Sequence, residues 1–519
     1  MSGISLSRRQ MLAALAAAGL SPAFYRSAAL AQGGKVLKVR SYADIQNLDP
    51  AFRKGAPEDD VMRNIFVGLA DMTPGDTWKW RLDAATKLEQ TDATHIDFTL
   101  MDGLVWSDGH GPVTADDVKF SFERMADPKL DSPYKGDWEV LDHVEVKDDK
   151  SGTIVLKAPF PPLWNVGLVF GSGKIVSRKA VEAMGGRFDT KPPAQSGRYL
   201  LKEWQPKQRV VLARNPDWKG EAPYFDEIHV IPIEDAKTAE LGLEAGDIDY
   251  TWVEASSIPR FKKTPPKGGK LAVKPSLAYV WLGMNVEAAP FDKLEVRQAV
   301  QKAIDVPSVL EAAYFGAAEP ATGIIAPGLI GHREKTLYSY DLDAARELLK
   351  KAGLESGFEC TLSILNTTEF TSAAQAVQAN LAEIGITVTI QQYDSGTFWS
   401  LGDQKSGDSW KKVQLIINRF SMQPDPSFAT DWFTPEQIGV WNWERWNSPE
   451  FGELNKKAKI ELDTQKRNDM YVRMQDLMDE SGAYVFLTHG AVGVCYSDKI
   501  DPALMPNGNP IFHGFKATA

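Results

Sequence analysis

The sequence predicts an α/β fold organised as two lobes. Segments with a period of two residues, typical of strands, alternate along the chain with amphipathic segments typical of helices. About 490 residues follow a predicted N-terminal signal, which is more than one hydrophobic core usually organises, so two or three domains are expected. A stretch rich in Lys, Pro and Gly at residues 262–269 separates two α/β regions. It is the candidate boundary between the lobes.

The first residues have the features of a signal peptide. Arg8 and Arg9 precede an Ala-rich apolar stretch at 11–20 that is too short to cross a bilayer, and an A-x-A cleavage site ends at Ala31. The arginine pair predicts export to the periplasm through the twin-arginine route, with residues 1–31 as the signal peptide. No later segment has eighteen consecutive apolar residues, so we expect no membrane span in the mature chain.

In the first region, alternation predicts the strands and end signals predict the helices. Thr114 followed by Asp116 and Asp117 predicts a helix start, because a threonine N-cap and acids in the first turn satisfy free amides and favour the helix dipole. Strands are predicted at 36–40, 94–100, 153–158, 228–231 and 247–253, with a hairpin at 199–213. Helices are predicted at 114–125 and 236–245, and a loop at Pro159, Pro161 and Pro162.

The second region repeats the alternation of strands and helices. Strands are predicted within 271–284 and at 361–365, 386–391 and 484–487. Helices are predicted at 295–303, 341–352, 372–384, 451–462 and 467–478. The strand–helix–strand order over 361–391 predicts a βαβ unit, and hence a second α/β lobe.

Charge and cysteine content narrow the class of function. The formal net charge is −11, and removal of the signal peptide takes away three arginines, so we expect no nucleic-acid partner. Cys360 and Cys495 are compatible with an exported protein. They form either one disulfide or two separate buried thiols, and the sequence leaves both possibilities open.

Motifs of covalent chemistry and of cofactor binding are missing from the sequence. It contains no GxxxxGKS/T, HExxH or GxSxG pattern, and its seven histidines show no helical pairing. The fragment from Gly171 to Lys174 is interpreted as an ordinary turn rather than a phosphate loop. We therefore do not expect an enzyme, and we expect no cofactor, no metal site and no catalytic residue.

Several sequence blocks carry a family resemblance over almost the whole mature chain. The strongest is IDFTLMDGLVWSDG at 96–109, followed by TADDVKFSFER at 114–124. Supporting blocks are LDPA at 48–51, NPDW at 215–218, GDID at 246–249, Asn285 ahead of PFD at 290–292, VRQAV at 296–300, AID at 303–305, the segment 341–353 and the helix containing Arg467. In this order they resemble the extracytoplasmic solute-binding proteins of peptide, opine and nickel ABC transporters, which form bacterial solute-binding family 5.

The resemblance implies a domain organisation and a partner. It implies a periplasmic-binding-protein fold of two α/β lobes that close on a ligand by a hinge, with an extra subdomain inserted in the first lobe. On this basis lobe I is expected at 32–265 plus 486–519, the extra subdomain at about 52–190, and lobe II at 266–485. The implied partners are a small-molecule or peptide-like ligand and the transmembrane permease of an ABC importer, and we expect the protein itself to be a monomer.

The resemblance also implies where the ligand lies. The loop before the LDP block provides Asp44, Ile45 and Gln46, and the segment before Pro-Asp-Pro at 424–426 provides Asn418, Arg419, Phe420, Ser421 and Met422. Peptide binders of the family have an aspartate at the position of Met422, where it pairs with the ligand's α-amino group. Without that carboxylate a buried ammonium is costly, which disfavours a free peptide N-terminus.

Other residue types suggest what the ligand site recognises. Arg419 is a candidate for binding a carboxylate or another anion through two hydrogen bonds, with an interlobe or surface ion pair as the alternative. Candidates for enclosing an apolar or sugar-like part, with core packing as the alternative, are Tyr134, Trp138, Trp399 and Trp432.

The leading hypothesis is therefore capture of a small organic solute for an ABC importer. The cargo is expected to be a modified peptide, an opine or an amino-acid conjugate. A secreted hydrolase and a carrier of a nickel or haem chelate are the alternatives. Ligand-induced stabilisation without turnover distinguishes a binding protein from a hydrolase.

Overall fold

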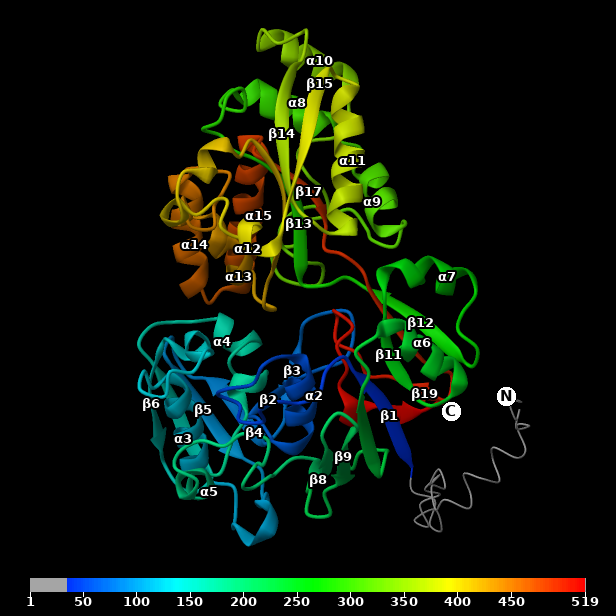
Figure 1. The fold of residues 1–519 in the computed structure, drawn as a ribbon. Coiled ribbons are helices and arrows are strands. Elements are labelled where there is room, and N and C mark those ends of the chain that lie inside the picture. Colours follow the sequence, from blue (N-terminus) through cyan, green and yellow to red (C-terminus); the bar gives the residue numbers. More distant parts are fainter. Residues whose placement is uncertain (1–34, 519) are drawn as a thin grey trace, which may run out of the picture. The chain divides into compact units, whose positions relative to one another are not determined.

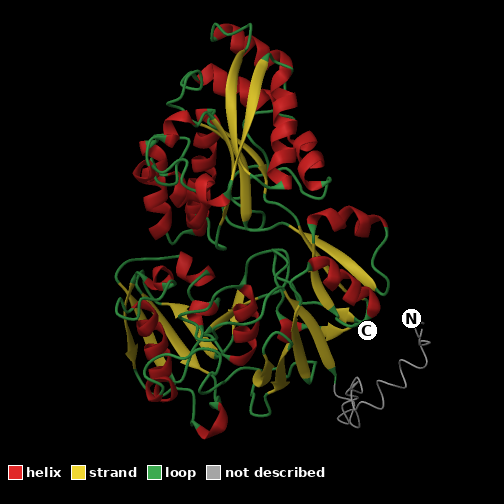
Figure 2. Ribbon diagram, viewed as in Figure 1, coloured by secondary structure: helices red, strands yellow, loops and turns green. Residues whose placement is uncertain are grey.

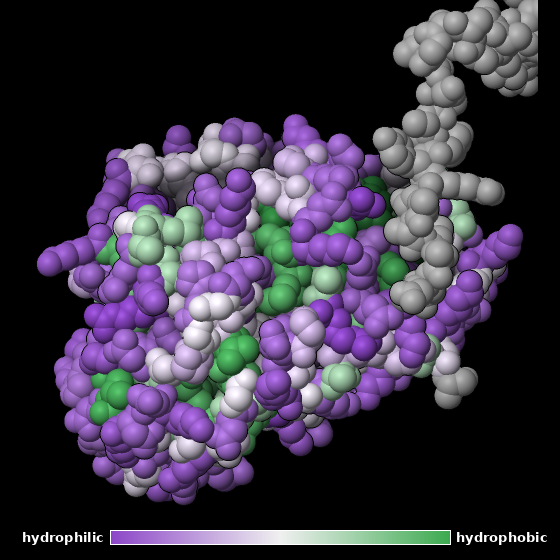
Figure 3. All heavy atoms as spheres, turned by 90° about the horizontal axis from the view of Figure 1, so that it is seen from below, coloured by the Kyte–Doolittle hydropathy of each residue, from purple (hydrophilic) through white to green (hydrophobic). Residues whose placement is uncertain are grey.

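The computed structural model describes residues 35–518, which fold into two α/β lobes (Figures 1 and 2). The predicted signal peptide, residues 1–31, lies outside the described residues. No helix within 35–518 is long and apolar enough to cross a membrane. On the face seen in Figure 3 hydrophilic residues predominate, and hydrophobic residues form small separate patches.

The first lobe is built on a mixed seven-stranded sheet. Its strand order is β12 (Gly269–Lys274), β18 (Val492–Ser497), β11 (Tyr250–Val253), β1 (Val36–Ser41), β10 (Glu227–Pro232), β9 (Arg209–Arg214) and β8 (Tyr199–Gln205). The central strand β1 runs parallel to β10 and β11, and its side chains alternate between half-buried and buried, as the sequence predicts. Two helices accompany this sheet, α6 (Ala236–Ala245) and α7 (Ile258–Lys263), and a small ribbon pairs β19 (Ile500–Asp501) with β20 (Lys516–Ala517).

A second, antiparallel sheet lies within the first lobe. It has the order β4 (Ala85–Gln90), β5 (His95–Leu100), β7 (Ser151–Leu156) and β6 (Leu141–Val146). Helix α3 (Ala115–Ala126) begins at Thr114, whose hydroxyl accepts a hydrogen bond from the Asp117 amide while the Asp117 carboxylate accepts one from the Thr114 amide. The remaining elements here are α2 (Ala56–Ile65), β2 (Ala70–Met72), β3 (Trp80–Leu82), α4 (Pro162–Asn165) and α5 (Arg178–Ala183).

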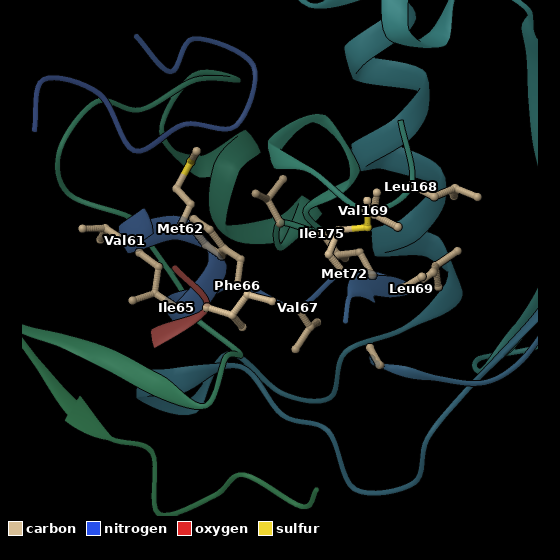
Figure 4. Close-up of a cluster of buried hydrophobic side chains, with 14 of the residues drawn as sticks. Val61, Met62, Ile65, Phe66, Val67, Leu69, Met72, Leu168, Val169 and Ile175 are labelled. Carbon is tan, nitrogen blue, oxygen red and sulfur yellow. The ribbon is translucent and has the colours of Figure 1, made fainter. Parts of the chain in front are cut away.

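One hydrophobic core joins these elements of the first lobe. Helix α2 directs Val61, Met62 and Ile65 into it, because these positions share one face of a helix. Figure 4 shows them with side chains from the β2 region and from the segment after α4. The labelled residues from those two segments are Phe66, Val67, Leu69, Met72, Leu168, Val169 and Ile175.

The second lobe has helices on both faces of a five-stranded sheet. The strand order is β15 (Ile386–Tyr393), β14 (Phe358–Leu365), β16 (Leu415–Ser421), β13 (Ala278–Met284) and β17 (Tyr484–Thr488). Alternation along β13 defines the two faces: Val280 and Leu282 belong to one core, and Tyr279 and Trp281 to the other. The first core includes α8 (Leu294–Ala303), α9 (Val306–Tyr314), α10 (Leu342–Lys351) and α11 (Thr368–Ala382), and the second includes α14 (Pro449–Ile460) and α15 (Thr464–Ser481).

The lobe boundaries differ from the predicted ones. Strand β12 pairs with β18 in the sheet of the first lobe, although it lies after residue 265, and β17 pairs with β13 in the sheet of the second lobe, although most of it lies after residue 485. The chain therefore crosses between the lobes near 275–277 and 489–491. The Ser276 hydroxyl, in the first crossing, donates a hydrogen bond to the His489 carbonyl, in the second.

The structure adds two further details, one about the proline-rich loop and one about the cysteines. The proline-rich loop contains the one-turn helix α4, whose first residue is Pro162, because proline suits the first turn of a helix. Cys360 lies in β14 of the second lobe and Cys495 in β18 of the first lobe, and both are free and buried. Burial raises the pKa of each thiol to about 12. Of the two possibilities left open by the sequence, the structure has separate thiols.

Candidate ligand-binding site

An aromatic pocket lies in the second lobe, where β16 ends. Its volume is about 350 Å³, near the lower end of the range of small-molecule sites. The pocket is lined by Trp399, Arg419, Phe420, Ser421, Trp432 and Trp441. Three of these residues are consecutive on β16, and the tryptophans come from two loops.

Phe420 is the centre of the aromatic wall. Its ring lies 6.3 Å from that of Trp399 in a stacked arrangement and 6.2 Å and 5.8 Å from those of Trp432 and Trp441, which meet it edge-on. The rings of Trp432 and Trp441 are 6.0 Å apart and also meet edge-on. Such contacts contribute beyond burial alone, so each ring helps to hold the others in place.

A second layer of aromatic residues supports Phe420 from below. The Trp281 ring lies 5.0 Å from that of Phe420, and its indole Nε1 donates a 2.7 Å hydrogen bond to Oε1 of Glu444. Glu444 is only 1 % exposed, and Oε2 has no hydrogen-bond partner within residues 35–518. Burial raises the pKa of this carboxyl to about 7.

The two loops that supply the tryptophans are fixed to each other. One loop follows β15 and contains α12 (Ser395–Phe398), next to Trp399; the other spans 431–446. Arg445, in the second loop, joins them, because its guanidinium lies 4.0 Å from the ring centre of Trp410 in the first loop. Nε of Arg445 also donates a 2.6 Å hydrogen bond to Glu287, which follows β13. The Asn442 amide donates to the carbonyls of Phe433, Thr434 and Trp446.

Arg419 is the only charged residue among those that line the pocket. Its side chain is exposed, and within residues 35–518 its guanidinium has neither a hydrogen bond nor an ion pair. The backbone amide is engaged, donating a 2.8 Å hydrogen bond to Oδ1 of Asn418. The guanidinium is therefore available to an incoming group.

Five of the predicted ligand contacts come together in this pocket: Trp399, Arg419, Phe420, Ser421 and Trp432. Sequence reasoning missed Trp441. The closely spaced tryptophans at 441, 443 and 446 were the available signal for it. A run of aromatic residues is equally typical of a core, and Trp443 and Trp446 are indeed buried.

Two predicted contacts from the same segment do not line the pocket. Asn418 is fully buried, and Met422 is 6 % exposed and packs in the core shared with α14 and α15. Side chains alternate along a strand, so Asn418 and Arg419 point to opposite faces of the sheet. The side chains of Asn418 and Met422 are therefore buried in the protein interior.

Of the ligand contacts predicted in the first lobe, Asp44 is hydrogen-bonded within the protein and Ile45 is buried. The Asp44 carboxylate accepts hydrogen bonds from Trp204 Nε1 (3.0 Å) and the Lys207 amide (2.7 Å), which ties its loop to the β8–β9 hairpin. Ile45 is buried, whereas Gln46 is exposed. Only Gln46 of this group presents an unburied side chain without a hydrogen bond of its own within residues 35–518.

The two aromatic candidates of the first lobe are correspondingly reassigned. Trp138 is fully buried, stacks on Phe122 at 4.1 Å and donates from Nε1 to the Ser172 carbonyl, so it is a core residue and the prediction that it encloses ligand is wrong. Tyr134 is half-buried beneath the guanidinium of Arg53, 3.4 Å from its ring centre. Neither residue lines the aromatic pocket.

Metal-ligating side chains are dispersed in the described part of the chain. Within residues 35–518 no three His, Cys, Asp or Glu side chains are grouped so as to hold a metal ion. His489 and His513 are buried, and burial lowers the pKa of each to about 4. The aromatic pocket has no histidine or cysteine among its described lining residues, and its chemistry is set by the aromatic wall and the guanidinium of Arg419.

Comparison with known proteins identifies the family. Residues 79–439 match the family described as "Bacterial extracellular solute-binding proteins, family 5 Middle". The chain is 27 % identical to the periplasmic oligopeptide-binding protein OppA of Salmonella typhimurium, over 93 % of this chain and 92 % of OppA. It is 26 % identical to the glutathione-binding protein GsiB of Salmonella typhi, over 91 % of this chain and 92 % of GsiB.

A solved structure shares the fold. The structure of HbpA2 from Haemophilus parasuis superimposes with a TM-score of 0.81 at 22 % identity, over 94 % of this chain and all of that one. The two-lobed α/β architecture predicted from the sequence is therefore confirmed. The chain belongs to the bacterial extracellular solute-binding proteins of family 5, and its role is to bind a solute.

Proposed function

We propose that this protein captures a small organic solute in the aromatic pocket and delivers it to the permease of an ABC importer. The observation that carries the proposal is the pocket itself: four aromatic rings and one unpaired guanidinium gathered at the end of β16. A concave apolar wall with few polar groups is the usual form of a small-molecule site.

The class of cargo is narrowed by the relatives and by the pocket wall. OppA and GsiB are named for binding oligopeptides and glutathione, which supports a peptide or a peptide-like conjugate as ligand. The wall of this pocket contains no carboxylate to pair with a peptide ammonium. A modified peptide, an opine or an amino-acid conjugate fits this wall better than an unmodified peptide N-terminus.

The transport cycle that we propose requires no covalent chemistry. Hinge motion at 275–277 and 489–491 would close the lobes and bring the loop of Asp44 to Gln46 to the ligand, so that the permease distinguishes loaded from empty protein. We further propose that the protein acts as a monomer in the periplasm, reached through the twin-arginine route. The Arg8–Arg9 pair supports that route.

A thermal-shift screen of the mature protein tests the function. Peptides, opines, amino-acid conjugates, sugars and metal chelates are added separately, and one class should raise the melting temperature saturably because it binds only the folded state. The same ligand should be recovered chemically unchanged. Release of a product would instead indicate a hydrolase, and a shift by metal chelates alone would indicate a chelate carrier.

A matched pair of tryptophan variants connects the result to the pocket. Trp441→Ala removes one wall of the pocket and should weaken binding at least about tenfold, as expected for an aromatic residue at a binding hot spot. Trp218→Ala removes a half-buried tryptophan of the first lobe and serves as the control. Equal affinity in the wild type and Trp441→Ala would place the ligand elsewhere.

A further inference from the structure

We infer that the ligand of the aromatic pocket is an organic anion: a flat or ring-bearing apolar body that carries a carboxylate and no cationic group at the end held by Arg419. The inference rests on the proposed function, because it concerns the chemistry of the same pocket. It follows from the charges around the pocket, from the state of Arg419 and from the arrangement of the rings.

The pocket contains a positive charge without a compensating negative one. Arg419 is the only ionisable residue of the six that line the pocket. The acids around it are engaged elsewhere: the two oxygens of Asp431 accept 2.7 Å hydrogen bonds from Asn455 and Lys459. Glu444 lies buried in the layer below, bonded to Trp281, and Glu369 accepts a hydrogen bond from Tyr314. Among the described residues that line the pocket, none offers a carboxylate to a cationic ligand.

Arg419 differs from every other arginine of the second lobe. Each of the others is held by the protein: Arg297 by backbone carbonyls, and Arg333, Arg346, Arg445, Arg467 and Arg473 by carboxylates. Within residues 35–518, the guanidinium of Arg419 has no such partner and is stacked on no aromatic ring. A planar guanidinium left unpaired beside an apolar wall is suited to receive a carboxylate through two parallel hydrogen bonds.

The rings by themselves would allow a different ligand. Aromatic faces attract cations, and several rings around one space can bind a quaternary ammonium group. The fixed charge of Arg419 opposes that arrangement, since two like charges in one small pocket repel each other. The same charge strengthens the attraction of an anion, while the faces of Trp399, Trp432 and Trp441 remain available to an apolar ring.

Two probes that differ chiefly in charge test the inference. N-acetyl-L-tryptophan has a carboxylate and no ammonium, and L-tryptophan amide has an ammonium and no carboxylate. The dissociation constant of each is measured calorimetrically with the mature protein at pH 7.5 and low salt. We expect N-acetyl-L-tryptophan to bind at least about tenfold more tightly, and the preference to fall as salt is added.

Variants at Arg419 assign the preference to its charge. In Arg419→Ala the affinity for N-acetyl-L-tryptophan should fall by roughly 10- to 100-fold, as expected for a hydrogen bond to a charged group, and the affinity for the amide should not fall. Arg419→Lys keeps the charge but loses the two-pronged geometry, so it should retain part of the preference. Arg346→Ala, an exposed arginine of the same lobe outside the pocket, is the control.

The possible outcomes separate the inference from the proposed function. Tighter binding of the amide, equal binding of the two probes, failure of both probes to bind, or an unchanged preference in Arg419→Ala each overturns the inference. If one of these results occurs while another solute in the screen binds saturably, the proposed function stands and only the ligand class is wrong. If no solute binds the folded protein, the proposed function fails as well.

Discussion

Arg467 and Asp425 form a buried, bidentate ion pair. Nη1 and Nη2 of Arg467 each donate a 2.8 Å hydrogen bond to the Asp425 carboxylate, and both residues are at most 4 % exposed. Nε of Arg467 also donates to the Ala458 carbonyl in α14. Asp425 belongs to the Pro-Asp-Pro turn that follows β16, so the pair connects the strand of the aromatic pocket to α14 and α15.

Removal of Arg467 should strongly destabilise the second lobe. Arg467→Ala leaves the Asp425 carboxylate buried without its counter-charge, which typically costs about 3–5 kcal/mol. Urea unfolding followed by circular dichroism measures the loss. Arg473→Ala, on the same helix, removes an exposed arginine paired with Glu450 and Glu480, and should change stability by no more than about 1 kcal/mol. Similar losses in both variants would contradict the role assigned to Arg467.

The buried carboxyl of Glu444 should make stability depend on pH. Its pKa of about 7 in the folded protein lies above the ordinary value of 4.5, so the folded state holds this proton more tightly than the unfolded state. The protonated carboxyl therefore adds on the order of 3 kcal/mol to the free energy of unfolding. This stabilisation is complete below pH 4.5 and is lost as the pH rises through 7.

Glu444→Gln removes this titration. The free energy of unfolding of the variant should change less between pH 5 and pH 8 than that of the wild type, and the variant should gain relative stability at pH 8. Glu383→Gln, at an exposed position on the same lobe, is the matched control. If the wild type and Glu444→Gln have parallel pH profiles, the carboxyl does not titrate in this range.

The close approach of Gly402 to Trp443 should control the shape of the pocket. A Cβ atom at residue 402 would lie 2.1 Å from Cγ of Trp443, which is far inside the contact distance. Gly402→Ala should therefore displace the loop that carries Trp399, at a cost of about 1–3 kcal/mol and with weaker ligand binding. In Gly396→Ala the nearest contact is 3.3 Å, to the Asp394 side chain, and both properties should stay close to wild type. Calorimetry with the ligand from the screen, and thermal unfolding, measure the two effects.

The two cysteines should react only in the unfolded protein. Both are buried in different lobes, and a thiol with a pKa of about 12 carries almost no thiolate at neutral pH. A chromogenic disulfide reagent should label neither thiol in the folded protein and both in 6 M guanidinium. Dithiothreitol should leave the melting temperature unchanged, and a decrease would instead indicate a disulfide.

The sequence predicted those parts of the fold that depend on local periodicity. Alternation located β1 and β5, the N-cap Thr114 located the start of α3, and helical periodicity located α10, because caps and periodicity are set within a few residues of the chain. The same local signals failed for β16, whose residues Leu415, Ile416 and Ile417 are all buried and do not alternate. Its pairing with β13 and β14 makes it a strand.

The sequence by itself determined the α/β class, the order of most elements, the family and five residues of the pocket. Only the tertiary structure decided which candidates line the aromatic pocket. Trp138 and Trp399 are chemically alike, yet one is fully buried in the first lobe and the other lines the pocket. Likewise, only the tertiary structure shows that the other arginines of the second lobe have partners in the protein, whereas within residues 35–518 the guanidinium of Arg419 has neither a hydrogen bond nor an ion pair. Burial and pairing arise from contacts between segments distant in sequence, which residue type and local spacing do not specify.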